Sequence, residues 1–237
     1  NGNNASEITS NVSFVNGIKG QAAKFGGFNS PGHIRIPNSS TLQFSNEATF
    51  AFWLRLDDVA GMDGWGRYSA HGNFCLFAKD HDRYGMQSSA SIGTDNKLHL
   101  GTGDYWGHMG IGNKGYNGYQ IGNYIHITYA ISKDYTSLYI NGIKDTTVIG
   151  TFSFTQSNSR DLYFGKFSDY WYPLNGALDE FRIYNRTLSS NEVSQIYNSE
   201  KPATTNSTVQ PQISLSTGVV ELNGKVVVTG KGFTPLD

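Results

Sequence analysis

The chain has 237 residues, of which 16% are charged, and its 18 basic and 19 acidic residues leave a formal net charge of −1. A near-neutral chain without a basic block lacks the electrostatic footprint of proteins that bind nucleic acid or anionic membranes. No apolar run approaches the roughly 18 residues of a membrane span, so we expect no membrane insertion. Its one cysteine, Cys75, cannot form an intrachain disulfide, and its apolar neighbours predict a core residue.

Apolar and polar residues alternate with a period of two, which is the pattern of half-buried β-strands. The chain shows this pattern in residues 49–56, 97–100 and 124–131. The apolar faces of these strands would point into a core. The opposite faces would carry Trp53, Arg55, His99 and His126.

Asn141 and Gly142 interrupt an alternating stretch at residues 138–143. An Asn-Gly pair between strands predicts a type I′ hairpin, because both central residues of that turn need a positive φ.

One short helix is expected at residues 189–198. Ser189 and Glu192 have the spacing of a capping box, in which each side chain bonds to the backbone of the other residue. Val193, Ile196 and Tyr197 then form one apolar stripe, which predicts docking at an end or edge of the sheets. Together these signals predict an all-β fold, a two-sheet antiparallel jelly-roll sandwich with one short C-terminal helix.

The composition changes after Glu200, which divides the chain into three parts. Residues 1–200 would form the sandwich, and residues 201–212 (KPATTNSTVQPQ) a linker rich in Pro, Thr and Asn. Residues 213–237 resume strand character but are too few to bury a core. We interpret them as the truncated start of a second β-sandwich domain, which implies neighbouring domains in a longer chain.

Three sets of motifs resemble the laminin-G-like, concanavalin-A-like jelly-roll family. They are GIKGQAAKFGG with HIRIPNS (residues 17–27 and 33–39), YIHITY with LYING (124–129 and 138–142), and LYFG with NGALDEFRIYNRTLS (162–165 and 175–189). The resemblance implies a non-catalytic, lectin-like, carbohydrate-binding module of a larger secreted or cell-surface protein, of the disulfide-free kind common in bacteria. The tail resembles the start of an immunoglobulin-like domain of the TIG type.

The resemblance also implies a structural calcium ion near Asp179, with a backbone carbonyl from the turn at Gly27 as a second ligand. Alternation would place Asp179 on the same inward face as Phe181 and Ile183, where an unpaired carboxylate is costly. The alternative is an aspartate that caps backbone amides at the start of a strand.

Aromatic side chains in the irregular stretches are the expected carbohydrate platform, because their rings match the C–H faces of sugars. The alternative is that these rings pack beneath their own loops, which we favour for Trp53. The predicted carbohydrate-binding residues are Trp65, Tyr84, Tyr105, Trp106, Tyr170, Trp171, Trp53, Arg55, His99 and His126.

Two other functional classes remain open. A glycoside hydrolase on this fold would need two converging carboxylates, and no strand carries the alternating acids of the jelly-roll glucanases. We therefore predict no enzymatic activity. A protein-binding, adhesion or spacer domain is the second alternative, since this fold serves many functions.

Overall fold

The computed structural model describes residues 3–44, 47–58, 74–79, 86–92, 98–103, 120–150, 160–166 and 173–202, with backbone only for 86–92 and 98–103. The chain divides into two units, Asn1–Lys201 and Pro202–Asp237. The predicted linker after Pro202 and the predicted second domain lie outside the described residues. Every described strand and helix belongs to the first unit.

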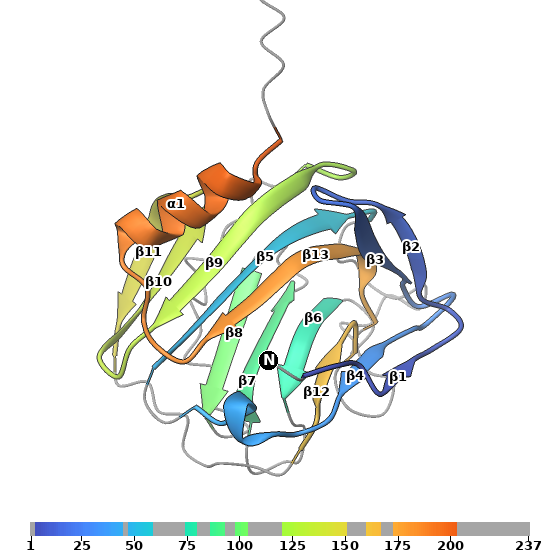
Figure 1. Cartoon of the computed structure of the whole chain (residues 1–237), viewed down its shortest axis with the longest axis horizontal. Coiled ribbons are helices and arrows are strands. Elements are labelled where there is room, and N and C mark those ends of the chain that lie inside the picture. Colours follow the sequence, from blue (N-terminus) through green and yellow to red (C-terminus); the bar gives the residue numbers. More distant parts are fainter. Residues whose placement is uncertain are drawn as a thin grey trace, which may run out of the picture. The chain divides into compact units, whose positions relative to one another are not determined.

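Two antiparallel sheets pack into a sandwich, which confirms the predicted fold (Figure 1). The six-stranded sheet has the order β1 (Glu7–Ile8), β4 (Ile34–Ile36), β12 (Leu162–Phe164), β6 (Phe74–Lys79), β7 (Met86–Ile92) and β8 (Leu98–Gly103). The seven-stranded sheet has the order β11 (Ile143–Ile149), β10 (Tyr135–Ile140), β9 (Tyr124–Ile131), β5 (Ala48–Leu56), β13 (Asn175–Tyr184), β3 (Gln21–Gly26) and β2 (Ser13–Asn16). A short 3-10 helix, η1 (Ser40–Leu42), precedes β5.

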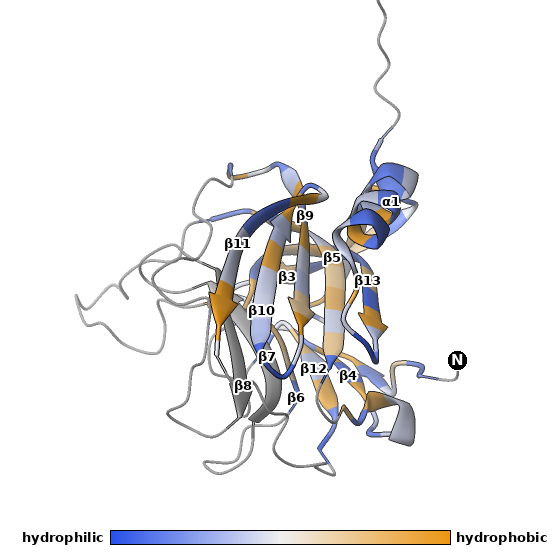
Figure 2. Cartoon of the chain, turned by 90° about the vertical axis from the view of Figure 1, so that its left-hand side faces the viewer, coloured by the Kyte–Doolittle hydropathy of each residue, from blue (hydrophilic) through white to orange (hydrophobic). Residues whose placement is uncertain are grey.

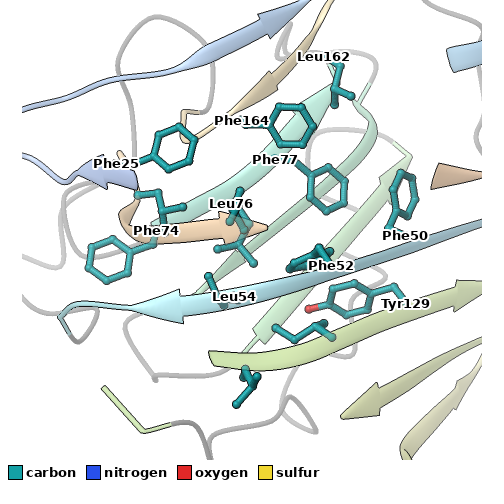
Figure 3. Packing of buried hydrophobic residues seen from close by; sticks show 14 of the residues in the cluster. Phe25, Phe50, Phe52, Leu54, Phe74, Leu76, Phe77, Tyr129, Leu162 and Phe164 are labelled. Carbon is teal, nitrogen blue, oxygen red and sulfur yellow. The ribbon is translucent and has the colours of Figure 1, made fainter. Parts of the chain in front are cut away.

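Aromatic rings fill the space between the sheets (Figure 3). The ring of Phe50 stacks on that of Phe77 at 4.8 Å, and Phe52 stacks on Phe181 at 5.1 Å. The alternation in residues 49–56 is thus confirmed as an inward apolar face. Cys75 is buried in β6, as expected, and burial raises the pKa of its thiol.

The helix α1 (Ser190–Glu200) begins at Ser189, whose side chain forms the predicted capping box with Glu192. Val193 packs against Ala130 and Tyr139 on the outer face of the seven-stranded sheet. The helix therefore covers a sheet face and not an end or edge, because the outward residues Ala130 of β9 and Tyr139 of β10 are apolar and pack against it. Figure 2 shows α1 on the side of the seven-stranded sheet that faces away from the six-stranded sheet. Within the described residues, no helix combines the length and apolar character needed to cross a membrane.

A β-bulge in β13 changes which side chains face the core. The pairing of β13 with β5 shifts between Asp179 and Arg182, and Glu180 takes a φ of 47°. Phe181 packs into the core as predicted, but Asp179 lies opposite Trp53 on the outer face. The prediction that Asp179 faces inward is wrong, because the extra residue reverses the alternation at this point.

The predicted hairpin joins β10 to β11. Asn141 has a φ of 50° and Gly142 a φ of 76°, so both central residues have the positive φ of a type I′ turn. A Cβ on Gly142 would lie 2.9 Å from Tyr197 of α1. The glycine thus serves both the turn and the close approach of the helix.

We expect Gly142→Ala to lower the free energy of unfolding more than Gly122→Ala does. Both glycines have a positive φ, which costs an alanine about 1–2 kcal/mol, but a Cβ at Gly122 would meet nothing within 4 Å. Crowding against Tyr197 should cost Gly142→Ala a further 1–3 kcal/mol or so. Urea unfolding of both variants measures the difference, and equal losses would show that the helix tolerates the added methyl.

Candidate functional site

Trp53 and His126 lie beneath α1, with 3% and 0% of their surfaces exposed. The indole Nε1 of Trp53 donates a 2.9 Å hydrogen bond to Oε2 of Glu200, and Nε of Arg182 forms a 2.6 Å ion pair with Oε1 of the same carboxylate. Tyr197 packs against both rings. The burial of Trp53 agrees with the interpretation favoured from the sequence, although the last turns of the helix cover the ring and not its own loop. The expectation that His126 lines an open surface is corrected, because the same turns cover it.

The imidazole of His126 is held neutral. Burial, with a smaller contribution from the positive charge of Arg182, lowers the pKa of His126 to about 4. Glu200 lies 3.8 Å from Nε2 of His126, but its carboxylate already holds Trp53 and Arg182. Neither ring nitrogen has a hydrogen-bond partner within the described part of the chain.

This burial predicts a pH-dependent stability. The unfolded chain binds a proton at His126 with the ordinary pKa of 6.5 and the folded chain only near 4, so protons favour unfolding between these values. The free energy of unfolding should fall as the pH falls from 6.5 to 4, by up to about 1.4 kcal/mol per pH unit from this group.

Urea unfolding of wild type and His126→Phe between pH 4 and 7 isolates this contribution, because other titrating groups are common to both proteins. The free energy of unfolding of the variant should fall less than that of the wild type as the pH is lowered. The same pH dependence in both proteins would contradict the lowered pKa of His126.

Asp179 holds the turn between β2 and β3. Its Oδ2 accepts hydrogen bonds from the backbone N–H groups of Ile18 at 2.6 Å and Lys19 at 3.2 Å. Its Oδ1 accepts the N–H of Glu180 at 2.9 Å. The carboxylate therefore faces three N–H donors, as in the alternative of an aspartate that caps backbone amides.

Gly27 has a local structural role. It takes a φ of 66°, donates its N–H to Leu174, and accepts the N–H of Ser30 at 3.3 Å. Its neighbour Gly26 pairs with Asn175, and a separation of four residues along β13 places this turn roughly 13 Å from Asp179. The two residues do not converge, and the N–H groups around Asp179 would repel a cation, so these residues do not fit a shared calcium ion.

Asp179→Ala should therefore destabilise the domain equally in EDTA and in millimolar calcium. Removal of the carboxylate leaves backbone donors at the turn without an acceptor, at a cost of about 2–4 kcal/mol. Thermal melts of both proteins in both buffers test this. A melting temperature that calcium raises in the wild type, and not in the variant, would restore the calcium site.

The open part of the same sheet face carries a second polar group, which we call the Tyr124 patch and define as Lys24, Arg55, Asp57 and Tyr124. Strand register places Tyr124 of β9 opposite Arg55 of β5, and Ala177 of β13 between Arg55 and Lys24 of β3. This row lies two residues along β5 from Trp53, where the helix no longer covers the sheet.

Ion pairs organise the Tyr124 patch. Arg55 donates to both oxygens of Asp57, from Nε at 2.7 Å and Nη2 at 3.1 Å, and Nζ of Lys24 lies 3.3 Å from Oδ2 of Asp57. The guanidinium carbon of Arg55 lies 5.4 Å from the centroid of the Tyr124 ring. The Tyr124 hydroxyl donates to the carbonyl of Asn16 at 3.3 Å.

These side chains are partly exposed, at 18% for Arg55, 21% for Asp57 and 39% for Lys24. Burial alone raises the pKa of Asp57, but the hydrogen bonds and charges of Arg55 and Lys24 outweigh it and hold the pKa below its usual value. Burial raises the pKa of Tyr124. At neutral pH the patch therefore offers charged donors, a charged acceptor and a neutral phenol to solvent.

Several connecting segments begin or end beside the Tyr124 patch. Gly122 N–H donates to the carbonyl of Leu56, Asp57 N–H to Asn175, and Leu174 N–H to Gly165. The described residues Leu56, Asp57, Gly122, Leu174 and Asn175 are therefore joined by backbone hydrogen bonds at this end of the sandwich.

Six of the ten predicted carbohydrate-binding residues cannot be placed. Trp65, Tyr84, Tyr105, Trp106, Tyr170 and Trp171 are outside the described residues. His99 lies on β8 opposite Ser91, in the six-stranded sheet, and is not brought together with Arg55.

Sequence reasoning singled out only Arg55 of the Tyr124 patch. Tyr124 and Asp57 carried a usable signal, since each lies two residues from a predicted site residue on the same strand face. No sequence signal pointed to Lys24, because its approach to Asp57 depends on the pairing of β3 with β13.

Solved structures with this fold include domain 4 of AbnA, an extracellular arabinanase from Geobacillus stearothermophilus, in complex with arabinotriose. The match has 19% sequence identity and a TM-score of 0.58, and covers 80% of this chain and 82% of that one. The binding domain of Paraclostridial Mosquitocidal Protein 1 matches with 23% identity and a TM-score of 0.61, over 84% of this chain and 48% of that one. Botulinum neurotoxin type C matches with 17% identity and a TM-score of 0.59, over 85% of this chain and 48% of that one. That structure concerns the dependence of cell entry on two ganglioside molecules.

The chain thus spans about half the length of the toxin chains that it matches. No curated protein sequence matches it. The family model Laminin_G_3, of the concanavalin A-like lectin/glucanases superfamily, matches residues 28–194, which is more than half of the chain. The chain therefore belongs to the concanavalin A-like lectin/glucanases superfamily.

Proposed function

We propose that this domain is a non-catalytic carbohydrate-binding module of a larger secreted or cell-surface protein, and that the Tyr124 patch forms part of its binding surface. The observation that carries the proposal is the Tyr124 patch on the outer face of the seven-stranded sheet, where an aromatic ring lies beside partly exposed donors and an acceptor. The fold relatives add support, since arabinotriose and gangliosides are named for two of them.

The chemistry of the row suits a sugar. A pyranose or furanose ring presents C–H groups that pack on an aromatic face, and hydroxyls that both donate and accept hydrogen bonds. Asp57 keeps lone pairs for a sugar hydroxyl, and Lys24 and the free N–H groups of Arg55 can donate to others. Trp171, one of the predicted carbohydrate-binding residues, is included in the proposal on the sequence alone, where it precedes the described Pro173 by two residues.

The state of Asp57 supports binding without hydrolysis. A glycosidase needs one carboxyl group that stays protonated near neutral pH to act as the acid. Arg55 and Lys24 instead hold the pKa of Asp57 below its usual value. Asp179, on the same face, accepts three backbone hydrogen bonds that fix it to a turn.

Affinity electrophoresis against a panel of plant, algal and microbial polysaccharides tests the proposal. Tyr124→Ala and Trp171→Ala should each weaken retardation by a bound polymer, by roughly 5- to 30-fold in the dissociation constant, the scale of about 1–2 kcal/mol for a stacked ring.

The control is Tyr135→Ala. Tyr135 is an exposed aromatic residue, and its neighbour Thr136 pairs with Ile131, at the end of β9 opposite to Tyr124. This variant should bind like the wild type, and melting temperatures exclude misfolding. If no polymer retards the wild type, the domain is a spacer or protein-binding module instead.

A further inference from the structure

We propose, resting on the carbohydrate-binding function above, that the Tyr124 patch selects uncharged, hydroxyl-rich glycans, and that Asp57 is the residue that excludes uronate- and sulfate-bearing ones. The inference comes from how the cations of the patch are already used. A surface that recognises an anionic sugar has to offer a cation whose donors are not committed to a carboxylate of the protein.

Arg55 is committed in this way. Its Nε and Nη2 donate to the two oxygens of Asp57 at 2.7 and 3.1 Å, which is the paired geometry that an incoming carboxylate or sulfate would need. Such a group would have to displace Asp57 or bind beside it as a like charge. A hydroxyl needs neither, because it can donate to Asp57 and accept from the remaining N–H groups of Arg55 at once.

Lys24 is engaged with the same carboxylate, at 3.3 Å from Oδ2 of Asp57. Asp179 adds a second negative charge to this face, opposite Trp53, and its field reaches Tyr124. Asp57 and Asp179 therefore reduce the positive potential that Arg55 and Lys24 would otherwise present on this part of the face. A weaker positive potential gives less long-range attraction to a polyanion.

The opposite interpretation is that Asp57 only stiffens Arg55 for an anionic ligand. The exposure of the pair disfavours it, because Asp57 is 21% exposed and Arg55 18%. The carboxylate is thus as open to solvent as the guanidinium, and a ligand that reaches Arg55 also meets the negative charge of Asp57.

Asp57→Asn tests the inference. The substitution keeps the size of the side chain and removes one negative charge, which leaves Arg55 and Lys24 without their compensating carboxylate. Each protein is run in affinity electrophoresis against paired polymers: galactan and polygalacturonate, dextran and dextran sulfate, and further neutral plant polysaccharides. Every run is made at low and at physiological salt.

The wild type should be retarded by at least one neutral polymer, equally at both salt concentrations, and not by the polyanions. Asp57→Asn should gain affinity for a polyanion by about fivefold or more at low salt, the scale of one unit charge a few ångströms away at a hydrated surface. The gain should shrink at physiological salt.

Asp161→Asn is the matched control. Asp161 pairs with Arg35, with Nε and Nη2 both at 2.6 Å from its Oδ2, on the other sheet. The variant has the same change in net charge, so a gain that appears in both variants would be a non-specific charge effect and would overturn the assignment to Asp57.

The remaining outcomes separate the two proposals. If the wild type prefers a polyanion, the proposed selectivity for uncharged glycans is wrong, while the proposed carbohydrate binding stands. Wild type that binds a neutral polymer, with an Asp57→Asn variant that gains no polyanion affinity, overturns the role of Asp57. Wild type that binds no polymer overturns the binding function itself.

Discussion

The single extra residue in β13 sets the two faces of the seven-stranded sheet. With the bulge between Asp179 and Arg182, Phe181 enters the core, and Asp179 and Arg182 both lie on the outer face. Asp179 then fixes the β2–β3 turn through three N–H groups, and Arg182 reaches the carboxylate of Glu200. A regular strand would have sent one of these charges into the aromatic core, where no partner could offset its desolvation.

The outer face of this sheet has a covered part and an open part. His126, Trp53 and Asp179 form one row across β9, β5 and β13, and the last turns of α1 close over its first two members. The next row, Tyr124 to Lys24, lies beyond the helix. The two outward aromatic residues thus have different surroundings: Trp53 anchors the helix through Glu200, while Tyr124 lies beside Arg55, where we propose that a ligand binds.

Unpaired charge is kept low in both rows, but in different ways. Beneath the helix, burial keeps His126 neutral, and Glu200 is balanced by Arg182. In the row from Tyr124 to Lys24, Asp57 pairs with both Arg55 and Lys24 and offsets part of their positive charge. The first arrangement stabilises a docked helix, and the second leaves hydrogen-bonding capacity at the surface with little net charge, which suits recognition of hydroxyl groups.

The sequence by itself determined the sandwich, the inward faces of β5 and β9, the Asn141-Gly142 turn and the capped helix, because period-two alternation, positive φ and the capping box are local properties of the chain. Of the Tyr124 patch, the sequence predicted Arg55 as a site residue and did not predict Lys24, Asp57 or Tyr124. Tertiary structure alone decided that Trp53 and His126 are covered, that Asp179 faces outward to a turn, and that Lys24 meets Asp57. Each of these depends on a contact between segments far apart in the chain, or on a bulge that shifts the alternation by one residue, and neither leaves a periodic trace in the sequence.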